Sequence, residues 1–191
     1  KSQKTIVEYT DPNPFKEFHI GHLMSNAIGE SISRLVEFSG AETKRANYQG
    51  DVGLHVAKAL WGLQQGLQHR GSTSMLGKAY ADGAKAYEEN ENAKKEIKEI
   101  NKKVYEKSDE DINALYDEGR KMSLEHFEEI YRKLGTKFDE YFFESEAGPV
   151  GKKLVEENTA QVFEESDGAI VFRGEEHGLH TRVFITSQGL P

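Results

Sequence analysis

The stretch that decides the fold is Phe18-His19-Ile20-Gly21-His22, near the start of the chain. It follows a β-like run, residues 5–9, and precedes a run whose apolar residues recur at helical spacing, Met24, Ile28, Ile32 and Leu35. A strand that turns sharply into a helix directs unpaired backbone N–H groups and the positive end of the helix dipole at one point, which suits a phosphate. Two histidines add donors beside a glycine that a flat ring can approach closely. The pattern predicts a nucleotide site.

Composition restricts the class of protein. The 191 residues are 30% charged and 36% hydrophobic, and no apolar run approaches the roughly 20 residues needed to cross a bilayer. The chain has no cysteine, which excludes disulfides, thiolate metal sites and thiol nucleophiles. The 25 basic and 33 acidic residues give a net charge of −8, so composition predicts no positive surface for a nucleic acid backbone. A cytoplasmic protein is expected.

The first part of the chain alternates strands and helices, as in a doubly wound α/β fold. Residues 5–9 are expected to form a buried parallel strand, followed by a turn and a helix that ends near Phe38. A second strand is predicted at 43–48, followed by a helix that buries Val56, Leu60 and Leu63.

Changes of composition divide the chain into four parts. Residues 1–63 are the first half of the core, 64–108 a helical insertion, 109–160 helices that return to the core, and 161–191 a β-hairpin and strand. The insertion opens with a polar break at 64–72, and its helical content rests on a narrow apolar stripe, Ile97, Ile100 and Val104.

Local signals predict the element boundaries in the last two parts. Ser108 is expected to cap a helix that bends or pauses at Gly119 and ends at Gly135. Pro149 predicts the first turn of a further helix that begins at Ala147. From Gln161 the apolar residues alternate with a period of two, which predicts a hairpin made of Val162-Phe163, a turn at 166–168 and residues 169–172. A last strand is predicted at 182–186.

The string from Glu8 to His22, with Pro12-Asn13, Lys16 and His-x-Gly-His, resembles the opening of class I aminoacyl-tRNA synthetases, most closely the arginyl-tRNA synthetases. A second, independent match covers 123–135, Phe138-Asp139 and Glu144-Ser145. The resemblance implies a Rossmann-like parallel sheet with a helical insertion and a β-hairpin, present as an incomplete fragment of the catalytic domain. It also implies a monomer that activates L-arginine with ATP and Mg²⁺ and charges tRNA(Arg) when full-length.

The resemblance also assigns roles to single residues. His19, His22 and Lys16 would act in catalysis by binding the ATP phosphates, and Gly21 would let adenine pack closely. The segment Asn47-Tyr48-Gln49-Gly50-Asp51-Val52-Gly53 resembles the family's Asn-x-x-Gly-Asp-x-Gly loop, which implies that Gly50 and Asp51 position ATP. The residues alone leave a second interpretation open, in which Asp51 is the N-cap of the following helix.

Glu8 and Asn13 are the residues that the resemblance implies for arginine recognition, because a carboxylate can pair with a guanidinium through two hydrogen bonds. Alternatively, Glu8 faces solvent, as most strand carboxylates do, and Asn13 only caps its own turn.

Two departures from the family pattern matter. Lys121-Met122-Ser123 imitates the start of the family's second, lysine-rich phosphate motif, but it lies within an amphipathic helix and is interpreted as packing. Ser187-Gln188-Gly189 has glutamine where the family has aspartate. The histidines show no metal-ligand spacing, so no metal site is predicted and Mg²⁺ would bind through the nucleotide.

Two other functions remain open. A small nucleotidyltransferase with the same histidine motif would share the strand, turn and helix. Alternatively, the chain is a catalytically incomplete fragment that binds ATP or a partner without turnover.

Overall fold

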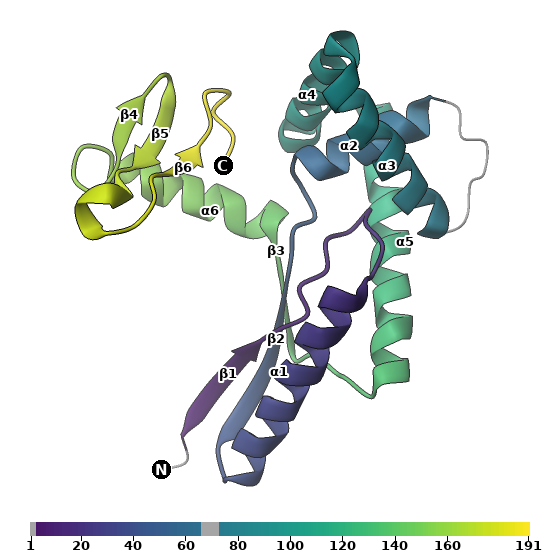
Figure 1. The fold of residues 1–191 in the computed structure, drawn as a ribbon, viewed down its shortest axis with the longest axis vertical. Helices are drawn as coiled ribbons and strands as arrows, with labels where there is room; N and C mark the ends of the chain where they lie inside the picture. The colour runs from purple at the N-terminus through teal and green to yellow at the C-terminus, as the bar shows by residue number, and fades with distance from the viewer. Residues whose placement is uncertain (1–2, 66–72) are drawn as a thin grey trace. The chain divides into compact units, whose positions relative to one another are not determined.

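The computed structural model describes residues 3–65 and 73–191 (Figure 1). The chain divides into two compact units, with the boundary between Glu144 and Ser145. Most of the polar break predicted at 64–72 therefore lies outside the described residues. Within the described part of the chain, no helix is both long and apolar enough to span a membrane.

The first unit is built on a parallel sheet of three strands, β1 (Lys4–Glu8), β2 (Glu42–Gln49) and β3 (Glu140–Phe143), in the order β1-β2-β3. Thr5 lies opposite Thr43, and Ala46 pairs with both Glu8 and Glu140. The two predicted strands and their parallel pairing are confirmed. The expected burial of the first strand is wrong, because β1 is an edge strand in this sheet and Ile6 is 68% exposed.

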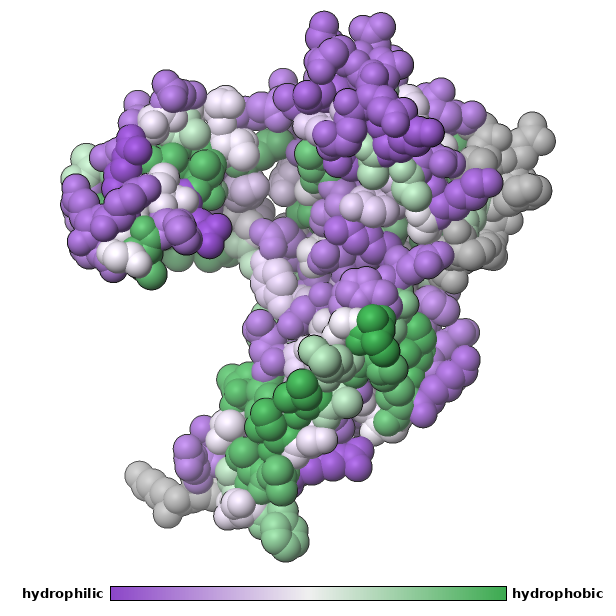
Figure 2. Space-filling view, viewed as in Figure 1, coloured by the Kyte–Doolittle hydropathy of each residue, from purple (hydrophilic) through white to green (hydrophobic). Residues whose placement is uncertain are grey.

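Helix α1 (Ile20–Phe38) follows β1 and ends where the sequence predicts. It packs through its small and polar side, Asn26, Gly29 and Ser33. Gly29 allows the close approach, since a Cβ there would lie 2.2 Å from Tyr9 Cγ. The apolar side of the helix faces solvent and forms the green surface over α1 in Figure 2, with exposed Ile20, Met24, Ile28, Ile32, Leu35 and Phe38.

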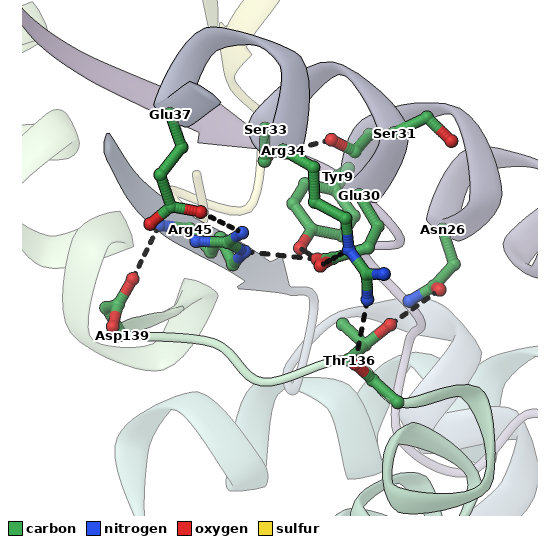
Figure 3. Close-up of polar contacts among 12 residues, drawn as sticks. Tyr9, Asn26, Glu30, Ser31, Ser33, Arg34, Glu37, Arg45, Thr136 and Asp139 are labelled. Carbon is green, nitrogen blue, oxygen red and sulfur yellow. Dashed lines mark hydrogen bonds and ion pairs between the residues drawn. The ribbon is translucent and has the colours of Figure 1, made fainter. Parts of the chain in front are cut away.

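Ionic side chains tie α1 to the sheet (Figure 3). Arg45 of β2 contacts Glu30 at 3.1 Å and Glu37 at 3.0 Å, both on α1. The Tyr9 hydroxyl donates to Glu30 at 2.6 Å, and the Arg45 backbone N–H donates to Asp139 at 2.9 Å. These contacts fix β2 to the helix that carries the histidine motif, and they tie the residue before β3 to β2.

Four helices supply most of the larger apolar cluster of the first unit, which also includes Phe15 and Val52: α2 (Leu54–Gln64), α3 (Thr73–Glu89), α4 (Glu91–Glu106) and α5 (Glu110–Leu134). Val56 and Leu60 of α2 are fully buried, as predicted, whereas Leu63 is only partly buried against them. The α4 stripe is also confirmed, and it joins the same core through Ile97, Ile100 and Val104.

Helix α5 differs from its prediction at two places. Its N-cap is Asp109, whose carboxylate accepts from the Ile112 N–H at 3.1 Å, so the expected cap at Ser108 is wrong. The helix also continues through Gly119, so the bend or pause expected there is wrong, and the missing side chain of Gly119 makes room for the Phe15 ring. It ends at Gly135, which adopts φ 70° as the sequence predicts.

The second unit contains most of α6 (Glu144–Glu157) and an antiparallel sheet of β4 (Glu164–Ser166), β5 (Ala169–Phe172) and β6 (Arg182–Ile185), with a short 3₁₀ helix at Gly174–His177. Asp167 and Gly168 have φ of 51° and 77°, which suits the tight turn of the predicted hairpin. Helix α6 begins at Glu144, so Pro149 lies beyond its first turn, contrary to prediction. Val162 and Phe163 precede β4 and are not in the strand.

Candidate active site

His19 and His22 form a closed pair at the start of α1. His19 is the N-cap, and its Nδ1 accepts from the Gly21 N–H at 3.1 Å. His22 Nδ1 in turn accepts from the His19 N–H at 3.2 Å, and the two rings stack with centroids 3.8 Å apart. Because both Nδ1 atoms accept, each neutral ring carries its proton on Nε2. The pair therefore presents two Nε2–H donors.

This arrangement changes the expectation that backbone N–H groups would hold a phosphate. Two amides at the start of α1, those of His19 and Gly21, already donate to imidazole nitrogens. Gly21 makes the arrangement possible, since a Cβ there would lie 2.9 Å from Cε1 of His19. Imidazole N–H groups held by the backbone therefore join the donors at this end of the helix.

Burial lowers the pKa of His22 to about 4, with further lowering from the nearby His19 and Lys16. His22 is therefore neutral at pH 7 and acts as a hydrogen-bond donor without a charge. The positive charge beside the pair is that of Lys16, whose Nζ lies 5.1 Å from the centre of the Tyr80 ring. Neutral donors and one cation are a suitable combination for an anionic group.

Asn13 connects the two loops that follow β1 and β2. Its Oδ1 accepts from the Gly50 N–H at 3.2 Å, and its backbone carbonyl accepts from the Lys16 N–H at 3.2 Å. Nearby, Asp11 accepts from the Tyr48 N–H at 2.8 Å. The side chain of Asn13 thus reaches the second loop, so the alternative in which it only caps its own turn is wrong. As expected for a doubly wound sheet, the two loops lie side by side.

Asp51 is completely buried and belongs to an ion pair. Its Oδ2 accepts from Arg120 Nε at 2.7 Å and from the Tyr116 hydroxyl at 3.3 Å, both on α5. The N-cap of α2 is Gly53, without a side-chain cap, so the alternative that Asp51 caps this helix is wrong. Sequence reasoning missed Arg120, because no local pattern links residues that lie 69 positions apart.

His55 also braces the second loop. Its Nε2 lies 2.8 Å from the Gly50 carbonyl oxygen, and burial lowers the pKa of the ring to about 4. A neutral ring with its proton on Nε2 donates to that carbonyl. Gly50 is therefore held through its N–H by Asn13 and through its carbonyl by His55.

Glu8 is the exposed last residue of β1 and lies opposite Ala46. Burial raises the pKa of the Asp11 carboxyl, and the negative charge of Glu8 raises it further. Burial likewise raises the pKa of Tyr48, with Glu144 and Glu8 among the other causes. Glu8 and Asp11 make an acidic corner at the carboxyl end of the sheet, which suits a cationic ligand.

A cavity of about 250 Å³ is lined by Lys16 and Phe18 from the segment before α1 and by Ser123 and His126 of α5, among others. Within the ranges that the structure describes, no three His, Cys, Asp or Glu side chains are placed to hold a metal ion.

A family model described as tRNA synthetases class I (R), catalytic domain, matches residues 1–189. The arginine–tRNA ligase of Borrelia garinii is 32% identical over 178 residues, which are 88% of this chain and 30% of that protein. The arginine–tRNA ligase of Clostridium perfringens is 32% identical over 195 residues, 99% of this chain and 34% of that protein. The chain therefore spans about a third of the length of these relatives.

The fold of the chain is also similar to solved structures of arginyl-tRNA synthetases. The arginyl-tRNA synthetase of Plasmodium falciparum superposes with a TM-score of 0.72 at 25% identity, over 99% of this chain and 32% of that one. The arginyl-tRNA synthetase of Thermus thermophilus superposes with a TM-score of 0.69 at 25% identity, over 99% of this chain and 34% of that one.

Proposed function

The chain belongs to the family of class I arginyl-tRNA synthetase catalytic domains, and from this premise we propose that it takes part in the activation of L-arginine with ATP and in charging tRNA(Arg). In this reaction the arginine carboxylate attacks the α-phosphorus of ATP, pyrophosphate leaves, and the arginyl group then passes to the terminal ribose of the tRNA. Such a reaction needs positioning and charge stabilisation and no covalent nucleophile on the protein.

The observation that carries the proposal is the stacked histidine pair. His19 and His22 would donate from Nε2 to phosphate oxygens of ATP, and Lys16 would supply the positive charge. Gly21 is exposed, so its backbone would be open to adenine. Mg²⁺ would arrive with the nucleotide and neutralise phosphate charge.

The loop after β2 would hold the nucleotide from the other side. Gly50 lies against Asn13 and His55, and Asp51 is anchored by Arg120, so the backbone of this loop is fixed before a ligand binds. A preorganised loop loses little conformational freedom on binding. In this proposal Asp51 acts on ATP through the loop it anchors, because its own carboxylate is buried.

Arginine would bind at the acidic corner. The Glu8 carboxylate is exposed and can accept two hydrogen bonds from a guanidinium. Asn13 uses its Oδ1 for Gly50, which leaves its amide N–H₂ to donate to the amino acid. Selection of arginine over an uncharged isostere would then depend on the charge of Glu8.

We expect Glu8→Gln to weaken L-arginine binding roughly tenfold or more, because charge-assisted hydrogen bonds to the guanidinium are lost. Calorimetric titration of the chain with L-arginine, L-lysine and L-citrulline, in the presence of Mg·ATP, tests this. The control is Glu42→Gln, which removes an exposed carboxylate at the opposite end of the sheet and should leave arginine binding unchanged.

Equal binding of arginine and citrulline would contradict the assignment of Glu8. ATP binding without any amino-acid preference would instead favour a nucleotide-binding half-site, as in a nucleotidyltransferase or a catalytically incomplete fragment.

A further inference from the structure

The turn Asn13-Pro14-Phe15-Lys16 adopts a conformation that normally requires glycine. The Lys16 N–H donates to the Asn13 carbonyl at 3.2 Å, Pro14 is at the second position, and Phe15 has φ 67° at the third. This is the pattern of a type II turn, whose third position favours glycine because of its positive φ. The first and last residues of the turn, Asn13 and Lys16, are the proposed contacts to arginine and to ATP.

Helix α5 holds Phe15 in this conformation. The Phe15 N–H donates to Ser123 Oγ at 2.9 Å, and both groups are buried. The Phe15 ring is fully buried against Gly119, where a Cβ would lie 2.3 Å from Cε1 of the ring. Ser123 itself donates to the Gly119 carbonyl at 2.8 Å, which fixes its hydroxyl so that a lone pair faces the turn.

We propose that Gly119 and Ser123 are positioning residues that lock the turn and so set the places of Asn13 and Lys16 relative to the histidine pair. The proposal rests on the proposed function of those residues. It also assigns a role to Ser123, which the sequence pattern alone attributes to packing. Without an acceptor on α5, the Phe15 N–H would be buried and unpaired, and the strained turn would lose one of the contacts that maintain it.

The chain offers a matched control for Ser123 in Ser33. Both serines are buried in helices, and both donate at 2.8 Å to the carbonyl of a glycine four residues earlier, Gly119 and Gly29 respectively. Among the hydrogen bonds of the described residues, Ser123 differs by also accepting from the backbone of the turn. Ser33 instead contacts the Tyr9 hydroxyl, so comparing Ser123→Ala with Ser33→Ala separates the loss of the hydrogen bond to the turn from the loss of a buried helical serine.

Two measurements on the whole chain test the proposal: the affinity for Mg·ATP by calorimetry, and amide hydrogen exchange at Phe15 and Lys16 by NMR. Ser123→Ala should weaken Mg·ATP binding about tenfold and speed exchange at Phe15 about tenfold or more, since a buried hydrogen bond is lost. Ser33→Ala should leave both within about twofold of the parent. Gly119→Ala, which displaces the Phe15 ring, should behave like Ser123→Ala.

The outcomes separate this proposal from the proposed function. Unchanged exchange at Phe15 in Ser123→Ala overturns the positioning role, whatever happens to ATP affinity. Faster exchange with unchanged ATP affinity overturns it as well, because the turn would then not matter for binding. If the parent chain does not bind Mg·ATP, the proposed function fails, and the exchange comparison with Ser33→Ala alone decides whether α5 locks the turn.

Discussion

Replacing Arg120 by alanine is expected to lower the free energy of unfolding of the first unit by about 3 kcal/mol, because the buried Asp51 carboxylate loses its ion-pair partner. The Asp51 carboxylate is 0% exposed and loses the guanidinium that lies 2.7 Å away. A carboxylate left buried without its cation costs more than the pair contributes when intact. Urea unfolding followed by the fluorescence of Trp61, the single tryptophan, reports on this unit.

The adjacent position on the same helix provides the control. Lys121 makes an exposed pair with Glu125 at 3.9 Å, so Lys121→Ala should change the free energy of unfolding by less than about 0.5 kcal/mol. Arg120→Met keeps an aliphatic chain but loses the guanidinium that lies 4.2 Å from the centre of the Phe143 ring, so it should remain nearly as destabilising as alanine. Equal effects of Arg120→Ala and Lys121→Ala would contradict the assignment of a buried ion pair.

Gly29→Ala is expected to destabilise the first unit by about 3 kcal/mol, although alanine is the better helix former by about 1 kcal/mol. A Cβ at this position would lie 2.2 Å from Tyr9 Cγ and 2.3 Å from Tyr9 Cβ. Relieving this overlap requires α1 to move away from Tyr9, the residue after β1, which would also shift the histidine pair.

The same Trp61 unfolding experiment tests Gly29→Ala. The control is Ala27→Gly on the exposed side of α1, which should cost only about 1 kcal/mol through helix propensity. A stabilising effect of Gly29→Ala would show that α1 and Tyr9 do not approach each other this closely.

The first two strands and the helices that follow them were predictable because their signals are local, whereas the short strand β3 was not predicted. The spacing of apolar residues after His22 identified α1, and Gly135 marked the end of α5. The His-x-Gly-His pattern predicted where the candidate site lies. It did not predict that the histidines cap the helix themselves, because the tetrad alone gives no ring orientation.

Features that depend on distant residues were not predictable. The apolar side of α1 is visible in the sequence, yet the helix packs through Gly29 and Ser33, which periodicity alone would assign to the outside. Asp51 has the spacing of an N-cap, but its partner Arg120 is on another helix. At Ser108-Asp109 two good capping residues are adjacent, and sequence preference does not distinguish them.

The most direct test of the histidine site is imidazole ¹⁵N NMR of the whole chain with and without Mg·ATP. We predict that His19 and His22 carry their protons on Nε2 at pH 7 and that His22 stays neutral down to about pH 4, below its ordinary pKa of 6.5. Mg·ATP should shift both Nε2 signals. ATP binding that leaves the Nε2 signals of His19 and His22 in place, or a His22 ring that titrates near 6.5, would contradict the account.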